Sequence, residues 1–511
     1  MGKQVSRDSK VTGPWIALVT MVALGLVLRL LYVSQIESAP FSDMADYETV
    51  ALNLLEGRGL IMSDLYKAYR PPGYPLLIAA VYKVAGTDPQ NIRVVQCLLS
   101  SASVVLLYLL VYSLFMLPTR GTPDGDSEPD QPPPSDEKVS SEKRASYTAL
   151  MSSAFFCFEE TSIFFCGQLL TETLFIFGML LWSFLLVRTV SKPTFGSATL
   201  IGVLSGFLIL IRPIFFPLVV LGAIWFYHHS RRFFDPPAKS WHSFHLMDSP
   251  YAPPMLMICY ALLVVSFWGM RNQVVLGRFV PVSTNSGINF YLGHHEGFGY
   301  ASFGVKEDIR QYLRNRGIND EVEESLVFTQ LGMSYIREHR QEVFRNTLAK
   351  LYYLFLAPAD LKSALNPMKW WTYVESPYRP WPWESQDRRI RFFRIQDGEG
   401  HTLLPSYRKW FWQEGRLPLI SWGWPMIILS VTGLIWSAKR REPIDLIVLI
   451  GIVYTLVLLV FFTNARFRTP LLPYMYVFAG YTVVALLGKW FGSTKVVAFA
   501  DPEPEPENPE D

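Results

Sequence analysis

Apolar runs recur along the chain and are separated by short polar or charged stretches. A helix needs about 20 residues to cross a hydrocarbon core of roughly 30 Å, and most of these runs approach that length. They lie near residues 15–35, 72–88, 94–117, 147–164, 168–190, 197–212, 213–228, 254–275, 417–437, 443–463 and 470–488. The pattern predicts an all-α polytopic membrane protein. Its first run lacks a small-residue cleavage site, so we expect a retained helix.

Lysine and arginine gather in the N-terminal tail, the loop at 231–239, the turn at 439–441 and the tail after 488. Basic stretches favour the cytoplasmic side, so both termini are predicted to be cytoplasmic and residues 276–416 external. The seven runs before residue 254 conflict with this, because they would leave the 231–239 loop outside. One early run is therefore expected not to cross. We favour the proline-rich run at 72–88, with fusion of 197–228 into one broken helix as the alternative.

The chain divides into four parts by composition. Residues 1–275 form an N-terminal transmembrane module, 276–416 an external region, 417–490 the C-terminal transmembrane helices and 491–511 a disordered acidic tail. Residues 118–146 are rich in Pro, Asp, Glu and Ser and are predicted to be a disordered insert. The external region has a helical pattern at 321–350 and many tryptophans, which indicate either an interfacial aromatic belt or sugar stacking.

Composition narrows the classes of partner. Half of the 511 residues are hydrophobic and the net charge is only +2, so we expect membrane lipid as a partner and no nucleic acid. The four cysteines lie in or beside apolar runs without paired ligand spacing, so neither a disulfide nor a metal cluster is predicted.

Two carboxylates follow the first apolar run directly. Asp43 and Asp46 are three residues apart at the start of a predicted interfacial helix whose apolar stripe contains Met44, Tyr47 and Ala51. Acids in a first helical turn often serve only as partners of the helix dipole. At a membrane surface, however, a carboxylate can take the proton of an acceptor hydroxyl during glycosyl transfer. Asp43 is therefore the candidate base.

Glu172 is the second candidate catalytic acid. It lies, like the pair at 159–160, in a long apolar region where an uncompensated charge is expensive. We therefore expect it near an external turn or facing a polar cavity, where it is either catalytic or a hydrogen-bonded helix-turn residue.

Arginines at predicted span ends are candidates for binding a departing phosphate, which requires cationic donors where negative charge grows. They are Arg70, Arg212, Arg271, Arg466 and Arg468. The alternative is that they anchor the spans by snorkelling. The polar loop that contains Asn285 and Asn289 suits a sugar or phosphate. The following His294-His295-Glu296 is a weak metal signal, so no cofactor is predicted and a divalent cation stays open.

Several motifs in order resemble the GT-C superfamily of membrane glycosyltransferases. They are Asp43-x-x-x-Tyr47, Arg70-Pro71-Pro72-Gly73-Tyr74-Pro75, Leu170-Thr171-Glu172, Arg212-Pro213, Arg271-Asn272, the loop at 285–289 and Arg466-x-Arg468-x-Pro470. More narrowly, the chain is similar to family 39, the bacterial dolichyl-phosphate-mannose protein mannosyltransferase and aminoarabinose-transferase-like group. It departs from that pattern at Glu159-Glu160, where prolines are common, and at His294-His295, where Gly-Asn is usual.

The resemblance implies a GT-C-type bundle of roughly 10–12 transmembrane helices with external loops. It also implies an inverting hexosyl- or pentosyltransferase of the cell envelope, in the plasma (inner) membrane. Its donor would be a polyprenyl-phosphate sugar and its acceptor a hydroxyl of a lipid, glycan or protein on the non-cytoplasmic face. Asp43 would occupy the family's acidic position, with Tyr47 and Tyr74 in the substrate-binding motifs.

The alternative function is a polyprenyl-linked glycan transporter or polymerase. A transporter would place its essential charges mid-span along a permeation path, whereas an enzyme would keep them at the external interface. The position of the charged motifs at predicted span ends favours the enzyme.

Overall fold

The computed structural model describes residues 5–36, 39–40, 42–117, 135–233, 249–295, 302–356, 423–461, 463 and 465–490. These residues form helices and contain no strand, which confirms the predicted all-α polytopic membrane fold. Along the chain the elements are α1 (Val5–Val33), α2 (Asp43–Leu55), α3 (Gly73–Ala85), α4 (Pro89–Phe115), α5 (Ser135–Cys157), α6 (Glu160–Cys166), α7 (Glu172–Thr189), α8 (Phe195–Ile211), η1 (Pro213–Phe215), α9 (Phe216–Ser230), η2 (Arg231–Phe233), α10 (Ala252–Leu276), α11 (Ser286–Gly293), α12 (Ser302–Asn315), α13 (Glu321–Glu338), α14 (Arg340–Leu351), η5 (Tyr352–Leu356), α18 (Trp424–Lys439), α19 (Asp445–Val460), η7 (Ala465–Leu471) and α20 (Leu472–Trp490).

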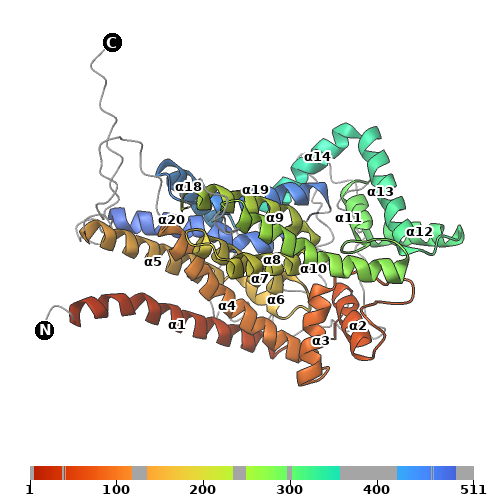
Figure 1. Ribbon diagram of the computed structural model, residues 1–511, viewed down its shortest axis with the longest axis horizontal. Helices are drawn as coiled ribbons and strands as arrows, with labels where there is room; N and C mark the ends of the chain where they lie inside the picture. The colour runs from red at the N-terminus through yellow and green to blue at the C-terminus, as the bar shows by residue number, and fades with distance from the viewer. Residues whose placement is uncertain are drawn as a thin grey trace, which may run out of the picture.

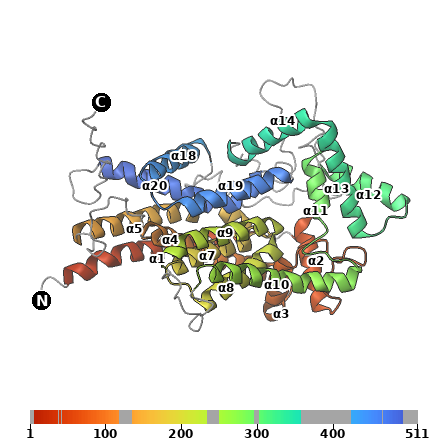
Figure 2. The ribbon, with the colours of Figure 1, turned by 45° about the horizontal axis from the view of Figure 1, so that its top comes forward.

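Long helices lie side by side, and helices α2, α3 and α11–α14 gather at one end of them (Figure 1, Figure 2). Six segments of the described chain are long and apolar enough to cross a membrane, as expected of a multi-pass membrane protein. They are Gly13–Val33, Pro89–Phe115, Glu172–Thr189, Pro213–Ser230, Ala252–Leu276 and Arg466–Gly488.

The run predicted not to cross forms α3. This helix has 13 residues, which gives a length of only about 20 Å, short of a hydrocarbon core. The alternative, fusion of 197–228, is wrong. Gly202 of α8 contacts α10 at Met257 and Gly206 contacts it further along, at Val264, so α8 and α10 run parallel. The end of α9 lies at the start of α10, where Tyr227 stacks on Tyr251 at 4.8 Å, so α9 and α10 run antiparallel. Helices α8 and α9 are therefore antiparallel.

Contacts at the other end of the bundle join α1 to α4 and α4 to the middle of α5. Further contacts join α5 and the end of α9 to the α18–α19 turn. They are Trp15 on Tyr108, Tyr108 to Ser146, Arg144 to Glu442 and His229 to Asp445. The part of α1 around Trp15 and the Arg231 turn therefore lie toward the same end of the bundle.

The run predicted at 147–164 is not one helix. Helix α5 ends at Cys157 and α6 begins at Glu160, and opposite charges stabilise the two ends. The Arg29 guanidinium donates to the Cys157 carbonyl at 2.9 Å, while the Glu159 carboxylate accepts from Ser162 N at 2.6 Å. Each charge matches the dipole of the helix end that it caps. Helix α5 also begins at Ser135, inside the stretch predicted to be disordered.

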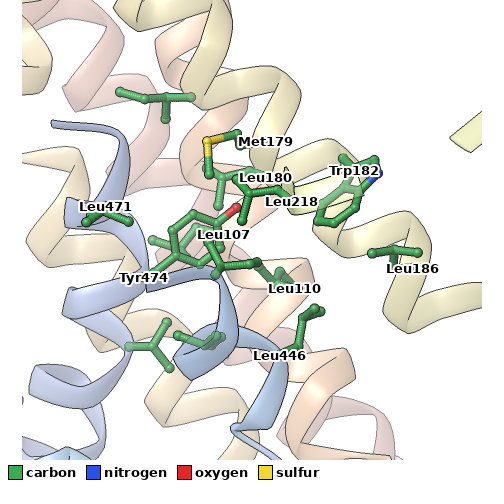
Figure 3. Close-up of a cluster of buried hydrophobic side chains, with 14 of the residues drawn as sticks. Leu107, Leu110, Met179, Leu180, Trp182, Leu186, Leu218, Leu446, Leu471 and Tyr474 are labelled. Atoms are coloured by element: carbon green, nitrogen blue, oxygen red, sulfur yellow. The ribbon is translucent and has the colours of Figure 1, made fainter. Parts of the chain in front are cut away.

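The apolar core lies among α4, α7, α9, α19 and α20 (Figure 3). It contains Leu107, Leu110, Met179, Leu180, Trp182, Leu186, Leu218, Leu446, Leu471 and Tyr474. Two of its aromatic rings place their polar atoms on side-chain partners: Trp182 Nε1 donates to Ser205 at 2.9 Å, and the Tyr474 hydroxyl lies 2.9 Å from Ser183 Oγ. This packing fixes the helices whose ends carry the charged residues.

The helical pattern predicted at 321–350 forms two helices, α13 and α14, which break at His339. At the end of α14, Lys350 donates to the Leu459 carbonyl at 2.9 Å, and His294 Nε2 lies 2.9 Å from the Val460 carbonyl. Both contacts hold the C-terminus of α19, and burial lowers the pKa of Lys350 to about 7. The predicted tryptophan-rich stretch, Glu296 and the tail 491–511 lie outside the described residues.

Gly73 lets the start of α3 approach the end of α8 closely. A Cβ at this position would lie 2.7 Å from Ile211 Cγ1 and 3.0 Å from both Ile211 N and the Leu210 carbonyl carbon. Because two of these atoms belong to the backbone, the neighbouring helix cannot simply rotate a side chain away. The Pro71-Pro72-Gly73 motif therefore brings the residue before it, Arg70, to the end of α8.

Gly73→Ala should destabilise the protein by about 1–3 kcal/mol, because it overpacks this contact. The measurement is the thermal unfolding midpoint of the purified protein in detergent. Gly196→Ala is the matched control, since its Cβ would meet nothing within 4 Å. An equal midpoint for the two variants would contradict the close approach.

Candidate functional site

Asp43 and Asp46 lie in the first turn of α2, as predicted. Met44, Tyr47 and Ala51 are buried along one stripe of this helix, as predicted, and Tyr47 lies one turn after Asp43. The side chains of Asp43 and Asp46 are 30% and 32% exposed, which makes them accessible from outside the bundle. The residue before them, Ser42, has φ 51° and ψ −130°, a strained conformation for a non-glycine residue.

Arg70 binds both aspartates. Its Nη2 donates to Asp43 Oδ1 and to Asp46 Oδ2, the latter at 2.6 Å, and its Nε donates to Asp46 at 3.2 Å. The guanidinium also lies 5.2 Å from the Tyr47 ring and 5.3 Å from the Tyr69 ring. Burial by itself would lower the pKa of Arg70, but Asp43 and the other neighbours raise it well above its usual value. Arg70 is therefore a permanent cation beside the candidate base.

Glu172 is the first residue of α7 and is fully buried. Arg212 reaches it from the end of α8, with Nη2 2.5 Å from Glu172 Oε1 and Nε donating to Thr171 Oγ1 at 2.7 Å. The sequence explains the position of Arg212. The residue before a proline avoids the helical region, and Arg212 is extended, with φ −142° and ψ 113°, before Pro213. Helix α8 therefore ends where its arginine meets the start of α7.

Arg466 of η7 links the two groups of charges. Its Nε donates to Glu172 Oε1, its Nη2 lies 3.4 Å from Glu172 Oε2, and its Nη1 lies 3.5 Å from Asp43 Oδ2. The result is a continuous series of alternating charges, which we call the ion-pair chain: Asp46, Arg70, Asp43, Arg466, Glu172 and Arg212.

The ion-pair chain brings together predicted residues from the α2 start, the 66–70 segment, α7, α8 and η7. Tyr47 packs beside it, and Tyr74 packs on Tyr47 at 5.3 Å with its hydroxyl donating to Gln96. Arg271 lies elsewhere and donates to the carbonyls of Lys67 and Leu60, at 2.9 and 3.0 Å.

The other three predicted binding residues have different surroundings. Asn285 accepts a hydrogen bond from Ser283 at 2.9 Å, and Asn289 is half-buried on α11. Arg468, although only two residues from Arg466, is buried beside η5, where its Nη1 donates to the Leu354 carbonyl at 3.3 Å.

Thr171 and Tyr454 join the site without having been predicted. Thr171 accepts from Arg212, and its signal was its place next to Glu172. Tyr454 of α19 is fully buried near Arg212, and in the sequence it was only one aromatic residue in an apolar run. Arg212 Nη1 and the Tyr454 hydroxyl are among the buried polar atoms of the described residues that bond to no other side chain or backbone group, and they interact with each other. Such atoms can receive an oxygen of a ligand.

The charges of the ion-pair chain balance, since three carboxylates face three guanidinium groups. The exposed fraction of the carboxylate side chains falls along it, from about a third at the two aspartates to zero at Glu172. The exposed aspartates can exchange protons with a bound molecule, and the buried arginines can share an anionic group with Glu172. The arrangement is therefore suited to taking a proton at one place and stabilising negative charge next to it.

No protein-family model matches the chain, and no curated protein matches it. Among solved structures, it is similar to the oligosaccharyltransferase of Archaeoglobus fulgidus. For that protein tethered by a disulfide bond to an acceptor peptide with the NVT sequon, the TM-score is 0.42 at 9% identity, over 95% of this chain and 52% of that chain. For its complex with Zn and sulfate, the TM-score is 0.41 at 11% identity, over 94% and 50%. The chain thus spans about half the length of the oligosaccharyltransferase.

Glu172→Gln should destabilise the fold strongly, by roughly 3–5 kcal/mol, because it leaves two buried arginines without their carboxylate. Asp46→Asn should cost under about 1 kcal/mol, because this partner is a third exposed and Arg70 keeps Asp43. The free energy of unfolding in mixed detergent micelles measures both. Equal losses of unfolding free energy in the two variants would show that the buried ion pairs do not contribute more to stability than the partly exposed ones.

Proposed function

We propose that this protein is an inverting GT-C-type glycosyltransferase that moves a hexose or pentose from a polyprenyl-phosphate donor to an acceptor hydroxyl. The observation that carries the proposal is the ion-pair chain, which puts an accessible carboxylate, Asp43, next to the buried arginines. The motif order that resembles family 39 supports the same class. No cofactor is part of the proposal.

Asp43 acts as the general base in this proposal. A base for glycosyl transfer must contact the acceptor hydroxyl while the anomeric carbon is attacked from the face opposite the leaving phosphate. Asp43 has a 30% exposed side chain, and Arg70 on its Oδ1 favours the ionised form that accepts a proton. Asp46 shares Arg70 and holds it in place.

Arg466 and Arg212 stabilise the departing phosphate in this proposal. Both guanidinium groups bind Glu172, and an arriving phosphate can share them, because each guanidinium has several N–H donors and can bind more than one anionic group. Arg212 Nη1 and the Tyr454 hydroxyl add buried hydrogen-bonding atoms. Donors fixed before reaction stabilise developing charge without reorganising, which is the main source of rate in this kind of chemistry.

The site faces the non-cytoplasmic side of the plasma membrane in this proposal. The basic residues Arg188, Arg231 and Lys439 are at or near the ends of helices that run away from the ion-pair chain. Basic ends favour the cytoplasm, so the opposite end faces outward. There a lipid-borne donor and an acceptor on lipid, glycan or protein would both reach Asp43.

A transporter or polymerase of polyprenyl-linked glycans is the alternative. Its essential charges would line a path through the spans. Arg29 does lie within a span, but it donates to Ser100, Ser162 and the Cys157 carbonyl at the α5–α6 break. These fixed contacts suit a structural charge, and the alternating charges at the helix ends favour transfer chemistry.

Asp43→Asn should lower turnover by roughly two to four orders of magnitude while leaving folding nearly intact, as expected for loss of a general base. The assay is sugar transfer in liposomes from labelled polyprenyl-phosphate mannose, glucose or arabinose to lipid, glycan and peptide acceptors. Asp64→Asn, at an exposed position in the loop after α2, is the control. Turnover of Asp43→Asn within a few fold of wild type would move the role to Asp46 or Glu172.

Single cysteines test the orientation in a background without the four native ones. Arg278→Cys, near the site, should react with an impermeant thiol reagent applied to intact cells. Lys192→Cys, in the exposed turn at the other end of the bundle, should react only after lysis. The reverse labelling pattern would put the site in the cytoplasm.

A further inference from the structure

The segment at 66–70, which ends in Arg70, is held by the external helices. Thr284 N donates to the Ala68 carbonyl at 3.0 Å, and Arg271 Nη1 donates to the Lys67 carbonyl at 2.9 Å. The segment therefore takes its position from the end of α10 and the loop after it.

One carboxylate makes the central contacts with this segment. Glu321, the first residue of α13, is only 3% exposed. Its Oε1 accepts from Lys67 N at 2.8 Å and from Ala68 N at 2.9 Å, and its Oε2 accepts from Thr284 Oγ1 at 2.7 Å. Burial raises the pKa of Glu321 and these hydrogen bonds lower it. Two consecutive backbone N–H groups on one oxygen fix the direction of the backbone two residues before Arg70.

Aromatic contacts extend this connection to the ion-pair chain. Arg310 of α12 donates to Glu324 at 2.8 Å, and its guanidinium lies 5.0 Å from the Tyr66 ring and 5.3 Å from the Tyr69 ring. Tyr69 in turn packs against the Arg70 guanidinium. Helices α12 and α13 thus contact the residues directly before Arg70, which binds Asp43 and Asp46.

We propose that Glu321 is a positioning residue, which holds the 66–70 segment so that Arg70 stays on Asp43 and Asp46. The inference rests on the proposed function, since it gives that reaction a residue outside the membrane helices that sets the geometry of the base. Catalytic constellations lose rate steeply when a supporting contact shifts by even an ångström. Glu321 touches neither the ion-pair chain nor the place for a substrate, so its effect passes through Arg70.

Two substitutions at Glu321 separate geometry from charge. Glu321→Ala leaves two backbone N–H groups without their acceptor and should lower kcat for transfer from polyprenyl-phosphate mannose roughly 10- to 100-fold. Glu321→Gln keeps an oxygen for both N–H groups, and the Thr284 hydroxyl can rotate to accept from the new amide. It should stay within about threefold of wild type. Glu323→Gln, on the same helix but 45% exposed, is the control and should change nothing.

A double-mutant cycle distinguishes positioning from general stability. In an Arg70→Gln background, adding Glu321→Ala should cost less than about twofold, because the residue through which it acts is already gone. The same loss with and without Arg70, or a Glu321→Ala turnover equal to wild type, would overturn the inference. Thr284→Val, which removes only the contact to Oε2, gives a milder variant for the same cycle if Glu321→Ala does not fold.

Amide hydrogen exchange of the full-length protein in detergent gives a readout that needs no substrate. Glu321→Ala, or Thr284→Val, should speed exchange in peptides covering 60–70 and leave α7 and α8 unchanged. Unchanged exchange in 60–70 would overturn the positioning role. A wild-type protein that transfers no sugar from any donor would refute the proposed function alone, because exchange still reports whether Glu321 holds the segment.

Discussion

The structure depends on pairing charges that an apolar bundle would otherwise exclude. Glu172 is fully buried, and an isolated carboxylate there would cost several kcal/mol. Arg212 and Arg466, from two different helix ends, offset that cost by pairing with Glu172. Arg466 also pairs with Asp43. Each charge in the ion-pair chain is thus neutralised by the next charge along it. The positions of α2, α7, α8 and η7 relative to one another follow from this requirement.

Interruptions in the helices bring these charges together. Pro213 forces Arg212 out of the helical conformation at the end of α8, and Gly73 allows α3 to touch that same end. A third interruption, between α5 and α6, is stabilised by Arg29 on one helix end and Glu159 on the other. In a membrane bundle, polar backbone groups freed by a break need partners, so breaks and buried charges occur together.

The site combines parts of different rigidity. Glu172 and Arg212 are fixed by tightly packed helices, whereas Asp43 and Asp46 are a third exposed and Arg70 is on a segment that α13 holds. The proposed transfer from a lipid-borne donor to an acceptor hydroxyl would use both kinds of part. Arg212 and Arg466 at the buried end provide guanidinium groups in fixed positions. Asp43 and Asp46 at the outer end are accessible to a bound molecule. Lys350 and His294, which hold the end of α19, likewise link α14 and α11 to the element before Arg466.

The amino-acid sequence is enough to predict the class of fold, and all six residues of the ion-pair chain stand out in it as candidates. The length of the apolar runs predicted the membrane helices, because burial in lipid demands long apolar helices with paired backbone groups. Prolines and the distribution of basic residues singled out the run that forms the short α3. Carboxylates and arginines at the span ends stood out because charge is rare there. Only the tertiary structure decided which of them pair. It separated Arg468 from Arg466, since neighbours in a 3-10 turn point in different directions, and it placed Arg271 on backbone carbonyls. It also brought in Glu321 and Tyr454, far along the chain from Asp43, because contacts between distant segments leave no local pattern in the sequence.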